Sequence, residues 1–267
     1  MQRESQNICG VNACLAVFER RAQDIERVYY HIARASDIGH VLKWAASQRL
    51  PYREVDLASL EKLSHSTHHE GLVFTVKALE YRTCGPDTVA PGQSWVALDG
   101  VENPHNIGAI ARTCAFFGCA GLLLGGVQPG TRLPASLLRA AEGGAELLPL
   151  YGCPELAPLL TRLRSRGLPV FGLETDVDAV FSPSTAAADG VLVFGSESLG
   201  ISPRVREACS GLLKLQGAGA LQSLNVSVSV AMALTLSHCG VDPLRKQTPS
   251  REPVGQGTGS KRRLRRR

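Results

Sequence analysis

The chain has 267 residues, of which 44% are hydrophobic and 20% are charged, and a formal net charge of +5. This length allows one large or two modest domains, and the composition is ordinary for a globular protein. No apolar run approaches the roughly 20 residues that span a bilayer, and residues 1–6 lack the apolar core of a signal peptide. We therefore expect a cytoplasmic protein that makes no membrane contact.

The positive charge is concentrated at the end of the chain. Residues 243–267 hold nine Lys and Arg residues and one Glu, a net charge of +8, so that the first 242 residues carry −3. The segment is also rich in Pro, Gly, Ser and Thr, which predicts a disordered tail. Such a tail suits contact with phosphate backbones, although a solvated tail without a specific role is the alternative. The residues predicted to bind RNA are Lys261, Arg262, Arg263, Arg265, Arg266 and Arg267.

Eight cysteines are spread along the chain. None forms a C-x-x-C pair, and no cluster of histidines accompanies them, so zinc ligation is not favoured. Buried, reduced thiols are the expected state, and we predict no metal site.

The first part of the chain reads as a small α/β unit that ends near residue 83. Apolar spacing predicts helices at 10–20, 38–46 and 59–63, the last with Ser59 as its N-cap. Strands are predicted at 25–30, 52–55 and 71–76. A linker rich in Pro and Gly follows at 84–94.

From residue 95 to 242, predicted strands and helices alternate, which indicates a mostly parallel sheet covered on both faces. Residues 223–238 are ambiguous, because Asn225 to Val230 alternate as in a strand while the apolar continuation suits a helix; a helix is predicted. The other predicted strands are 95–98, 122–124, 170–173, 191–194 and 212–215, and the other predicted helices are 107–117, 136–141, 155–166 and 203–209.

Three separated segments carry the functional signal: residues 103–112 (NPHNIGAIAR), 194–200 (FGSESLG) and 215–227, which ends in SLNVS. Gly195 and Gly217 each follow a predicted strand, at the edge where open α/β sheets bind ligands, and a glycine lets the backbone approach a ligand closely. Ser223 and Asn225 stand at a predicted helix start, where they could cap the helix or receive an anion. Arg112 has apolar or small neighbours, so it is expected to need an anionic partner.

Together these segments resemble the three motifs of the SpoU/TrmH branch of the SPOUT RNA methyltransferases. The resemblance covers residues 95 to about 240, and residues 7–80 are similar to that family's N-terminal substrate-binding module. It implies a deep trefoil knot in the second domain, a homodimer, and methyl transfer from S-adenosylmethionine to a ribose 2′-hydroxyl of tRNA or rRNA. One departure is Leu215-Gln216-Gly217, where the family usually has Ile-Pro-Met before its glycine.

Carried over to this sequence, the resemblance assigns two overlapping sets of residues. Arg112 would help to activate the hydroxyl, and Glu197 would orient Asn106 or Arg112; His105 ranks below Arg112 as a candidate base. The catalytic set is Asn106, Arg112, Glu197, Ser223 and Asn225, and the cofactor-binding set is Gly195, Leu215, Gly217, Ser223, Leu224 and Asn225.

Two other functions compete with this one. A non-catalytic RNA-binding or ribosome-assembly factor could keep the fold, but it would have no reason to keep Asn106, Arg112, Glu197 and Asn225 together. A nucleotide-dependent oxidoreductase is suggested only by residues 217–222, where Gln222 replaces the last glycine of G-x-G-x-x-G.

Overall fold

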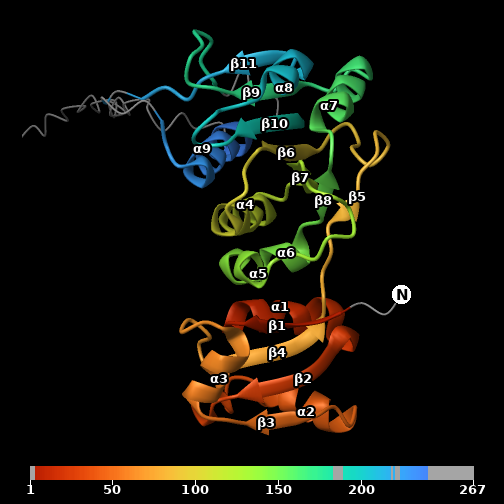
Figure 1. The fold of residues 1–267 in the computed structure, drawn as a ribbon, viewed down its shortest axis with the longest axis vertical. Coiled ribbons are helices and arrows are strands. Elements are labelled where there is room, and N and C mark those ends of the chain that lie inside the picture. Colours follow the sequence, from red (N-terminus) through yellow and green to blue (C-terminus); the bar gives the residue numbers. More distant parts are fainter. Residues whose placement is uncertain (1–3, 183–188, 218, 220–222, 240–267) are drawn as a thin grey trace, which may run out of the picture.

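The computed structural model describes residues 4–182, 189–217, 219 and 223–239. It contains two sheets that lie one beyond the other along the long axis of the molecule, with the N-terminal sheet at the bottom of Figure 1. Within the described residues, no helix has both the length and the apolar character needed to cross a membrane.

The N-terminal unit is a four-stranded sheet with three α-helices. The strand order is β1-β4-β2-β3; β4 is antiparallel to β1 and β2, while β3 is parallel to β2. Its elements are β1 (Ser5–Cys9), α1 (Val11–Arg21), β2 (Ile25–Tyr30), α2 (Gly39–Ser47), β3 (Tyr52–Glu54), α3 (Leu57–Ser64) and β4 (Leu72–Lys77), with single 3-10 turns at Ala22–Asp24 and Ile32–Arg34.

The predicted helices and strands of this unit are confirmed, with shifts of one or two residues at most ends. The predicted cap of α3 is wrong: Asp56 is the N-cap, and its Oδ1 accepts a hydrogen bond from the Ser59 amide at 2.8 Å. Hydrogen bonding to Ser59 lowers the pKa of the Asp56 carboxyl. Strand β1 was not predicted, because Gln6 and Asn7 interrupt its apolar pattern.

The second sheet has seven strands in the order β11-β9-β10-β6-β7-β8-β5, and every pairing in it is parallel. Arg82 and Thr83, at the end of the predicted N-terminal domain, form β5 and pair with β8 in this second sheet. The strands are β5 (Arg82–Thr83), β6 (Ser94–Asp99), β7 (Gly121–Gly125), β8 (Leu150–Cys153), β9 (Val170–Leu173), β10 (Gly190–Gly195) and β11 (Gly211–Leu213).

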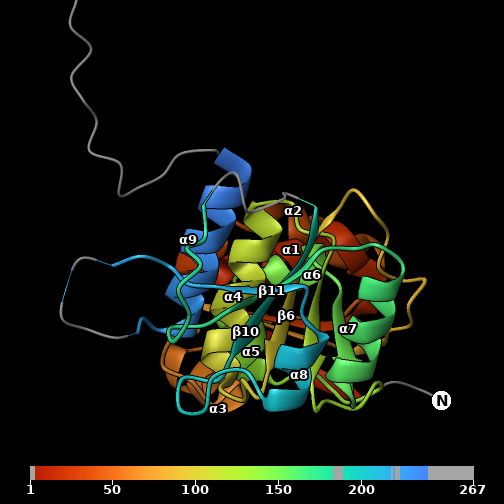
Figure 2. The same cartoon turned by 90° about the horizontal axis from the view of Figure 1, so that it is seen from above.

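Helices cover both faces of this sheet, as predicted. Helices α4 and α9 lie side by side on one face, and α7 and α8 lie on the other (Figure 2). Strand β6 shows why: Val96 and Leu98 belong to the core under α4 and α9, while Trp95 and Ala97 belong to the core under α7 and α8. The helices are α4 (Pro104–Phe116), α5 (Ala135–Ala141), α6 (Gly144–Leu147), α7 (Leu156–Ser165), α8 (Pro203–Ala208) and α9 (Val226–Cys239).

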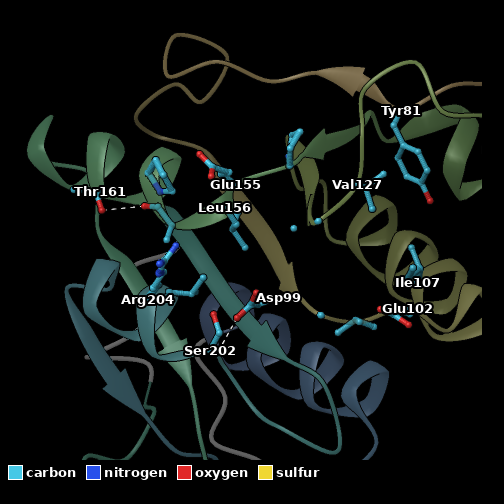
Figure 3. A pocket seen from close by; sticks show the side chains of 18 of the residues that line it. Tyr81, Asp99, Glu102, Ile107, Val127, Glu155, Leu156, Thr161, Ser202 and Arg204 are labelled. Carbon is cyan, nitrogen blue, oxygen red and sulfur yellow. Dashed lines mark hydrogen bonds between the residues drawn. The ribbon is translucent and has the colours of Figure 1, made fainter.

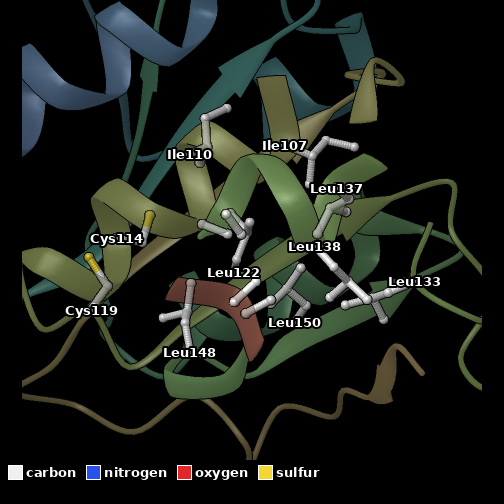
Figure 4. Close-up of a cluster of buried hydrophobic side chains, with 14 of the residues drawn as sticks. Ile107, Ile110, Cys114, Cys119, Leu122, Leu133, Leu137, Leu138, Leu148 and Leu150 are labelled. Atoms are coloured by element: carbon white, nitrogen blue, oxygen red, sulfur yellow. The ribbon is translucent and has the colours of Figure 1, made fainter. Parts of the chain in front are cut away.

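The core under α4 and α5 continues into the N-terminal unit. Ile110, Cys114 and Leu137 pack with Leu122 of β7 (Figure 4), and the same buried cluster includes Val17 of α1. The junction between the two sheets is therefore a packed apolar interface.

The ambiguous segment before the C-terminal tail is helical, as predicted, but α9 begins at Val226 rather than at Ser223. Strand β8 was not predicted. The resemblance implies that the carboxyl end of this domain threads a knot, and part of that end lies outside the described residues, so the knot stays a prediction. The basic residues predicted to bind RNA, 261–267, also lie outside them.

Candidate active site

The candidate site is built at the carboxyl edge of the second sheet, where β6, β10 and β11 end. Helix α4 starts just after β6 because Asn103 caps it, its Oδ1 accepting a hydrogen bond from the His105 amide at 2.9 Å, and because Pro104 takes the first helical position. This start places Asn106 in the first turn of α4, facing the other two loops.

A shared carboxylate joins the three segments. Glu197 Oε1 accepts hydrogen bonds from Asn225 Nδ2 at 2.7 Å and from Asn106 Nδ2 at 3.1 Å, and from the backbone N–H of Val226 at 3.4 Å. Asn225 Nδ2 also reaches Asn106 Oδ1 at 3.3 Å. Asn106 and Asn225, which are 119 positions apart in the sequence, thus bind the same oxygen atom. Three hydrogen-bond donors stabilise the negative charge of Glu197.

Asn225 also organises the start of α9. Its Oδ1 accepts a hydrogen bond from the Ser227 amide at 2.9 Å, in the manner of a helix cap. Since the same side chain donates to Glu197 through Nδ2, one residue fixes both the helix start and the loop after β10.

The loop after β10 is held closed by its own backbone and by two acids. A Cβ added to Gly195 would lie 2.0 Å from the carbonyl carbon of Gly200, so only glycine permits this approach. Glu174 accepts a hydrogen bond from the Ile201 amide at 2.7 Å, and Asp99 accepts one from the Ser202 amide at 2.7 Å. The sequence-based reasoning did not single out Glu174 or Asp99.

Arg112 is not part of this network. It lies six residues after Asn106 on α4, which turns it about a third of a revolution around the helix axis from Asn106. Its Nη1 pairs with Glu142 Oε1 at 2.7 Å, and its side chain is 58% exposed. The anionic partner expected for Arg112 is therefore a carboxylate from the turn between α5 and α6.

The other predicted residues surround the network without joining it. Leu215 is partly buried and Leu224 is 46% exposed, and a Cβ added to Gly217 would meet no atom of the described residues within 4 Å. Among the described residues, no hydrogen bond links Ser223 to Glu197. His105 is exposed and contributes its backbone amide to the cap of α4.

A cleft of about 940 Å³ opens beside the loop after β6 (Figure 3). Asp99 and Ser202 line one end of it, and Tyr81 lies at the other. Burial raises the pKa of the Tyr81 phenol to about 12. The walls carry both signs of charge, including Glu102, Glu155, Arg162 and Arg204.

Two family models match the chain, one over the second sheet and its helices and one over the N-terminal unit. Residues 93–235 match the model of the SpoU rRNA methylase family, and residues 7–82 match the RNA 2′-O ribose methyltransferase substrate-binding domain. The chain belongs to the SpoU rRNA methylase family.

Several relatives of this SpoU family chain match along most of their length. It is 31% identical to the "uncharacterized tRNA/rRNA methyltransferase YfiF" of Escherichia coli O157:H7, over 86% of this chain and 67% of that protein. It is 29% identical to the 23S rRNA (guanosine-2′-O-)-methyltransferase RlmB of Pseudomonas aeruginosa, over 91% of this chain and 98% of that protein.

Solved structures show the same fold. The SpoU methyltransferase AviRb from Streptomyces viridochromogenes, in complex with AdoMet, superposes with a TM-score of 0.71 at 18% identity, over 88% of this chain and 90% of that one. The predicted family and the α/β fold with a mostly parallel sheet are confirmed, and the chain is an RNA methyltransferase. Within the described residues, no group of three or more His, Cys, Asp or Glu side chains could hold a metal ion.

Two further residues at the site were given no role by the sequence-based reasoning. Glu142 pairs with Arg112, and Asn12 of α1 donates a hydrogen bond to Glu142 at 3.1 Å. The available signal was an acid directly before two glycines at the end of a predicted helix, but nothing local shows that this acid faces α4.

Proposed function

We propose that the protein transfers a methyl group from S-adenosylmethionine to a ribose 2′-hydroxyl of ribosomal RNA. The observation that carries this proposal is the meeting of Asn106, Glu197 and Asn225 at one carboxylate oxygen, in a chain of the SpoU family. The relatives named as 23S rRNA (guanosine-2′-O-)-methyltransferases, one of which matches over 98% of its length, support ribosomal RNA as the substrate class.

The cofactor would lie between the loops that follow β10 and β11. Leu215 and Leu224 offer apolar surface to a nucleoside, and none of the described residues fills the space beside Gly217. The residues present therefore fit the cofactor, which when bound supplies an electrophilic methyl group. The departure at Leu215-Gln216-Gly217 leaves main-chain contacts possible.

Glu197 serves to hold this pocket in shape rather than to react. Its carboxylate oxygen already receives three hydrogen bonds, from Asn106, Asn225 and the backbone of Val226. A carboxylate so engaged fixes the loops after β10 and before α9 relative to α4. Loops held in this way would orient the hydroxyl and the bound cofactor towards each other, and such positioning contributes to the rate of transfer.

Arg112 is the residue proposed to act on the substrate. A guanidinium stays protonated in proteins, so it cannot take the hydroxyl proton. It can bind an RNA phosphate and stabilise the negative charge that develops on the 2′-oxygen. Its side chain is 58% exposed and, among the described residues, its pairing with Glu142 uses Nη1, so the other donors are available for this purpose.

We propose a homodimer, because Arg112 and the Asn106 network occupy different faces of α4. A complete site would combine Arg112 of one protomer with the network of its partner. Helices α4 and α9 expose large apolar side chains that such an interface would bury: Phe116 is 83% exposed and Val228 is 46% exposed. The N-terminal unit and the basic tail would hold the RNA, and the protein would act in the cytoplasm.

Methyl transfer from labelled cofactor tests the proposal. Ribosomal RNA and tRNA from a strain lacking the gene are offered separately, and labelled nucleosides are checked for 2′-O-methylation. Label should enter ribosomal RNA with the wild type, fall about 100-fold or more with Arg112→Ala, and stay unchanged with Arg132→Ala, whose exposed side chain pairs with Glu4. Label only in tRNA would overturn the substrate class. Cofactor binding without transfer to either RNA would favour a non-catalytic RNA-binding protein.

A further inference from the structure

The turn between α5 and α6 contacts both the N-terminal unit and helix α4. Residues 142–144 lie between α1 on one side and Arg112 on the other. Two successive residues of this turn, Glu142 and Gly143, have positive φ angles of 44° and 90°. The turn is therefore a compact bridge between the part of the chain that matches the RNA-binding model and the helix that carries Arg112.

Both carboxylate oxygens of Glu142 are engaged, each with a different part of the molecule. Oε1 pairs with Arg112 Nη1 at 2.7 Å, and Oε2 accepts a hydrogen bond from Asn12 Nδ2 at 3.1 Å. The Glu142 side chain is 41% exposed, and at such exposure a single ion pair stabilises one side-chain rotamer only weakly. The two simultaneous contacts, with Arg112 and with Asn12, hold the side chain in this rotamer.

The backbone around Glu142 leaves little room for movement. A Cβ on Gly143 would lie 2.6 Å from Ala16 Cβ of α1, and a Cβ on Gly144 would lie 2.8 Å from Arg112 Cα. The turn thus touches both helices through glycine backbone, with no flexible side chain between them. A shift of α1 relative to the second sheet must therefore move the turn and the Glu142 carboxylate.

The left-handed backbone conformation of Glu142 also indicates a role for its side chain. Left-handed backbone is disfavoured for residues with a Cβ, at a cost on the order of 1 kcal/mol. A glycine or asparagine would relieve this at the end of α5, yet the position holds an acid that faces Arg112. Strain of this kind that coincides with a charged contact is a reason to look for a role of the side chain.

We infer that Glu142 is a positioning residue for Arg112, and that Asn12 ties this positioning to the N-terminal unit. The inference rests on the proposed function, in which Arg112 acts on the RNA. Pairing through Nη1 restrains the position of the guanidinium while leaving its other N–H groups for the phosphate and the 2′-oxygen. Because Asn12 of the N-terminal unit bonds to the other oxygen of Glu142, that unit influences where the guanidinium lies.

This role makes a specific kinetic prediction. Loss of the carboxylate releases the guanidinium, so the catalytic step slows, whereas Arg112 remains able to attract phosphate. Glu142→Ala should therefore lower kcat about tenfold while KM for the RNA stays the same or falls, since a negative charge near the phosphate is removed. Glu142→Gln, which keeps the shape and one acceptor, should lie between the wild type and Glu142→Ala.

A double-mutant cycle with Asn12 tests the link to the N-terminal unit. Asn12→Ala alone should lower kcat about threefold, and should have no further effect when Glu142 is already Ala, because the two act through one contact. Asp87→Asn is the matched control, since Asp87 lies outside the N-terminal unit in an exposed 3.1 Å pair with Arg166 and should leave kcat and KM unchanged. Cofactor affinity and the melting temperature are measured for every variant.

The outcomes separate this inference from the proposed function. A wild type that methylates no RNA removes the proposed function, and the inference with it. An active wild type with unchanged kcat in Glu142→Ala overturns the inference alone. So does a loss in Glu142→Ala that is matched by a loss of cofactor affinity and melting temperature, or an Asn12→Ala effect that adds fully to that of Glu142→Ala.

Discussion

Arg21 of α1 and Glu146 of α6 form a two-point ion pair across the junction between the two sheets: Nε lies 2.7 Å from Oε2, and Nη2 lies 2.9 Å from Oε1. Both side chains are buried, at 8% and 5% exposure, and Arg21 Nη1 also donates to the carbonyl of Lys77 at 2.7 Å. The pair joins the N-terminal unit to the second sheet next to the bridge formed by Glu142. It fixes the geometry on which that bridge depends.

Replacing Arg21 alone should destabilise the protein strongly. Arg21→Met leaves the Glu146 carboxylate buried without its partner, which costs about 3–5 kcal/mol in free energy of unfolding. Arg21→Met combined with Glu146→Leu should recover most of this loss, because neither charge remains buried. Urea unfolding measures both. Arg132→Met, which breaks the exposed pair with Glu4, should cost less than about 1 kcal/mol, and an equal loss in the two single variants would refute the argument.

The Glu197 carboxylate gives a second prediction, for the candidate site itself. Glu197→Ala removes the acceptor shared by Asn106, Asn225 and Val226. The side chain is exposed, so folding should change little, whereas the loops around the proposed cofactor pocket lose their common anchor. We expect cofactor affinity to fall about tenfold or more, measured by calorimetry, with a nearly unchanged melting temperature. Glu61→Ala, an exposed acid on α3, is the control, and equal cofactor affinity in both variants would contradict the prediction.

Much of this arrangement could be predicted from the sequence, for reasons visible in particular residues. Strands β6 and β10 are continuous apolar runs that face a core on both sides, which is the pattern of buried parallel strands. Asn106, Glu197 and Asn225 each follow a strand end, and parallel strands bring such ends to one edge. The network among them is consistent with the orienting role predicted for Glu197.

The pairing of Arg112 could not be predicted in this way. Its direction depends on rotation around α4, and its partner Glu142 belongs to a turn whose path is set by glycine contacts with α1 and α4. Neither depends on a local pattern. Strands β1 and β8 were missed for a similar reason: Gln6 in β1 and Gly152 in β8 break the periodicity, and pairing with neighbouring strands determines their structure.

Gly195 offers a test of the loop after β10. Gly195→Ala would place a methyl group 2.0 Å from the carbonyl carbon of Gly200, which forces the loop to open. Cofactor binding should be lost within the range of calorimetry, and the melting temperature should fall. Gly39→Ala is the matched control, because a Cβ there meets no atom within 4 Å, and it should bind the cofactor as the wild type does. Normal cofactor binding by Gly195→Ala would show that the closed loop is not needed.

The stability of the protein should decrease in alkaline solution, partly through Cys209. Burial raises the pKa of this thiol from 9.0 to about 11. Because the folded pKa is above the unfolded value, the contribution to stability is fully present below about pH 9 and is lost as the pH rises towards 11. Between pH 8 and 11, the melting temperature should therefore decrease less steeply with pH for Cys209→Ala than for the wild type.

The control for this pH dependence is a neighbour without a titrating group. Val205 packs in the same buried cluster as Cys209, so Val205→Ala should lower the melting temperature at every pH without changing its slope. Parallel pH profiles for the wild type and Cys209→Ala would show that the thiol does not contribute.

The exposed side chain of Phe116 tests the proposed dimer. At 83% exposure it contributes little to the fold of one chain, so Phe116→Glu should leave the melting temperature of the monomer unit nearly unchanged. In a dimer whose interface includes the end of α4, the added charge would be buried without a partner, and association should weaken about 100-fold or more. Sedimentation equilibrium measures this directly. In the proposed dimer, Arg112 of one protomer completes the site with Glu197 of its partner, so methyl transfer should fall with the dimer fraction and recover as protein concentration is raised. Activity that stays constant per chain while the protein dissociates would show that one chain holds a complete site.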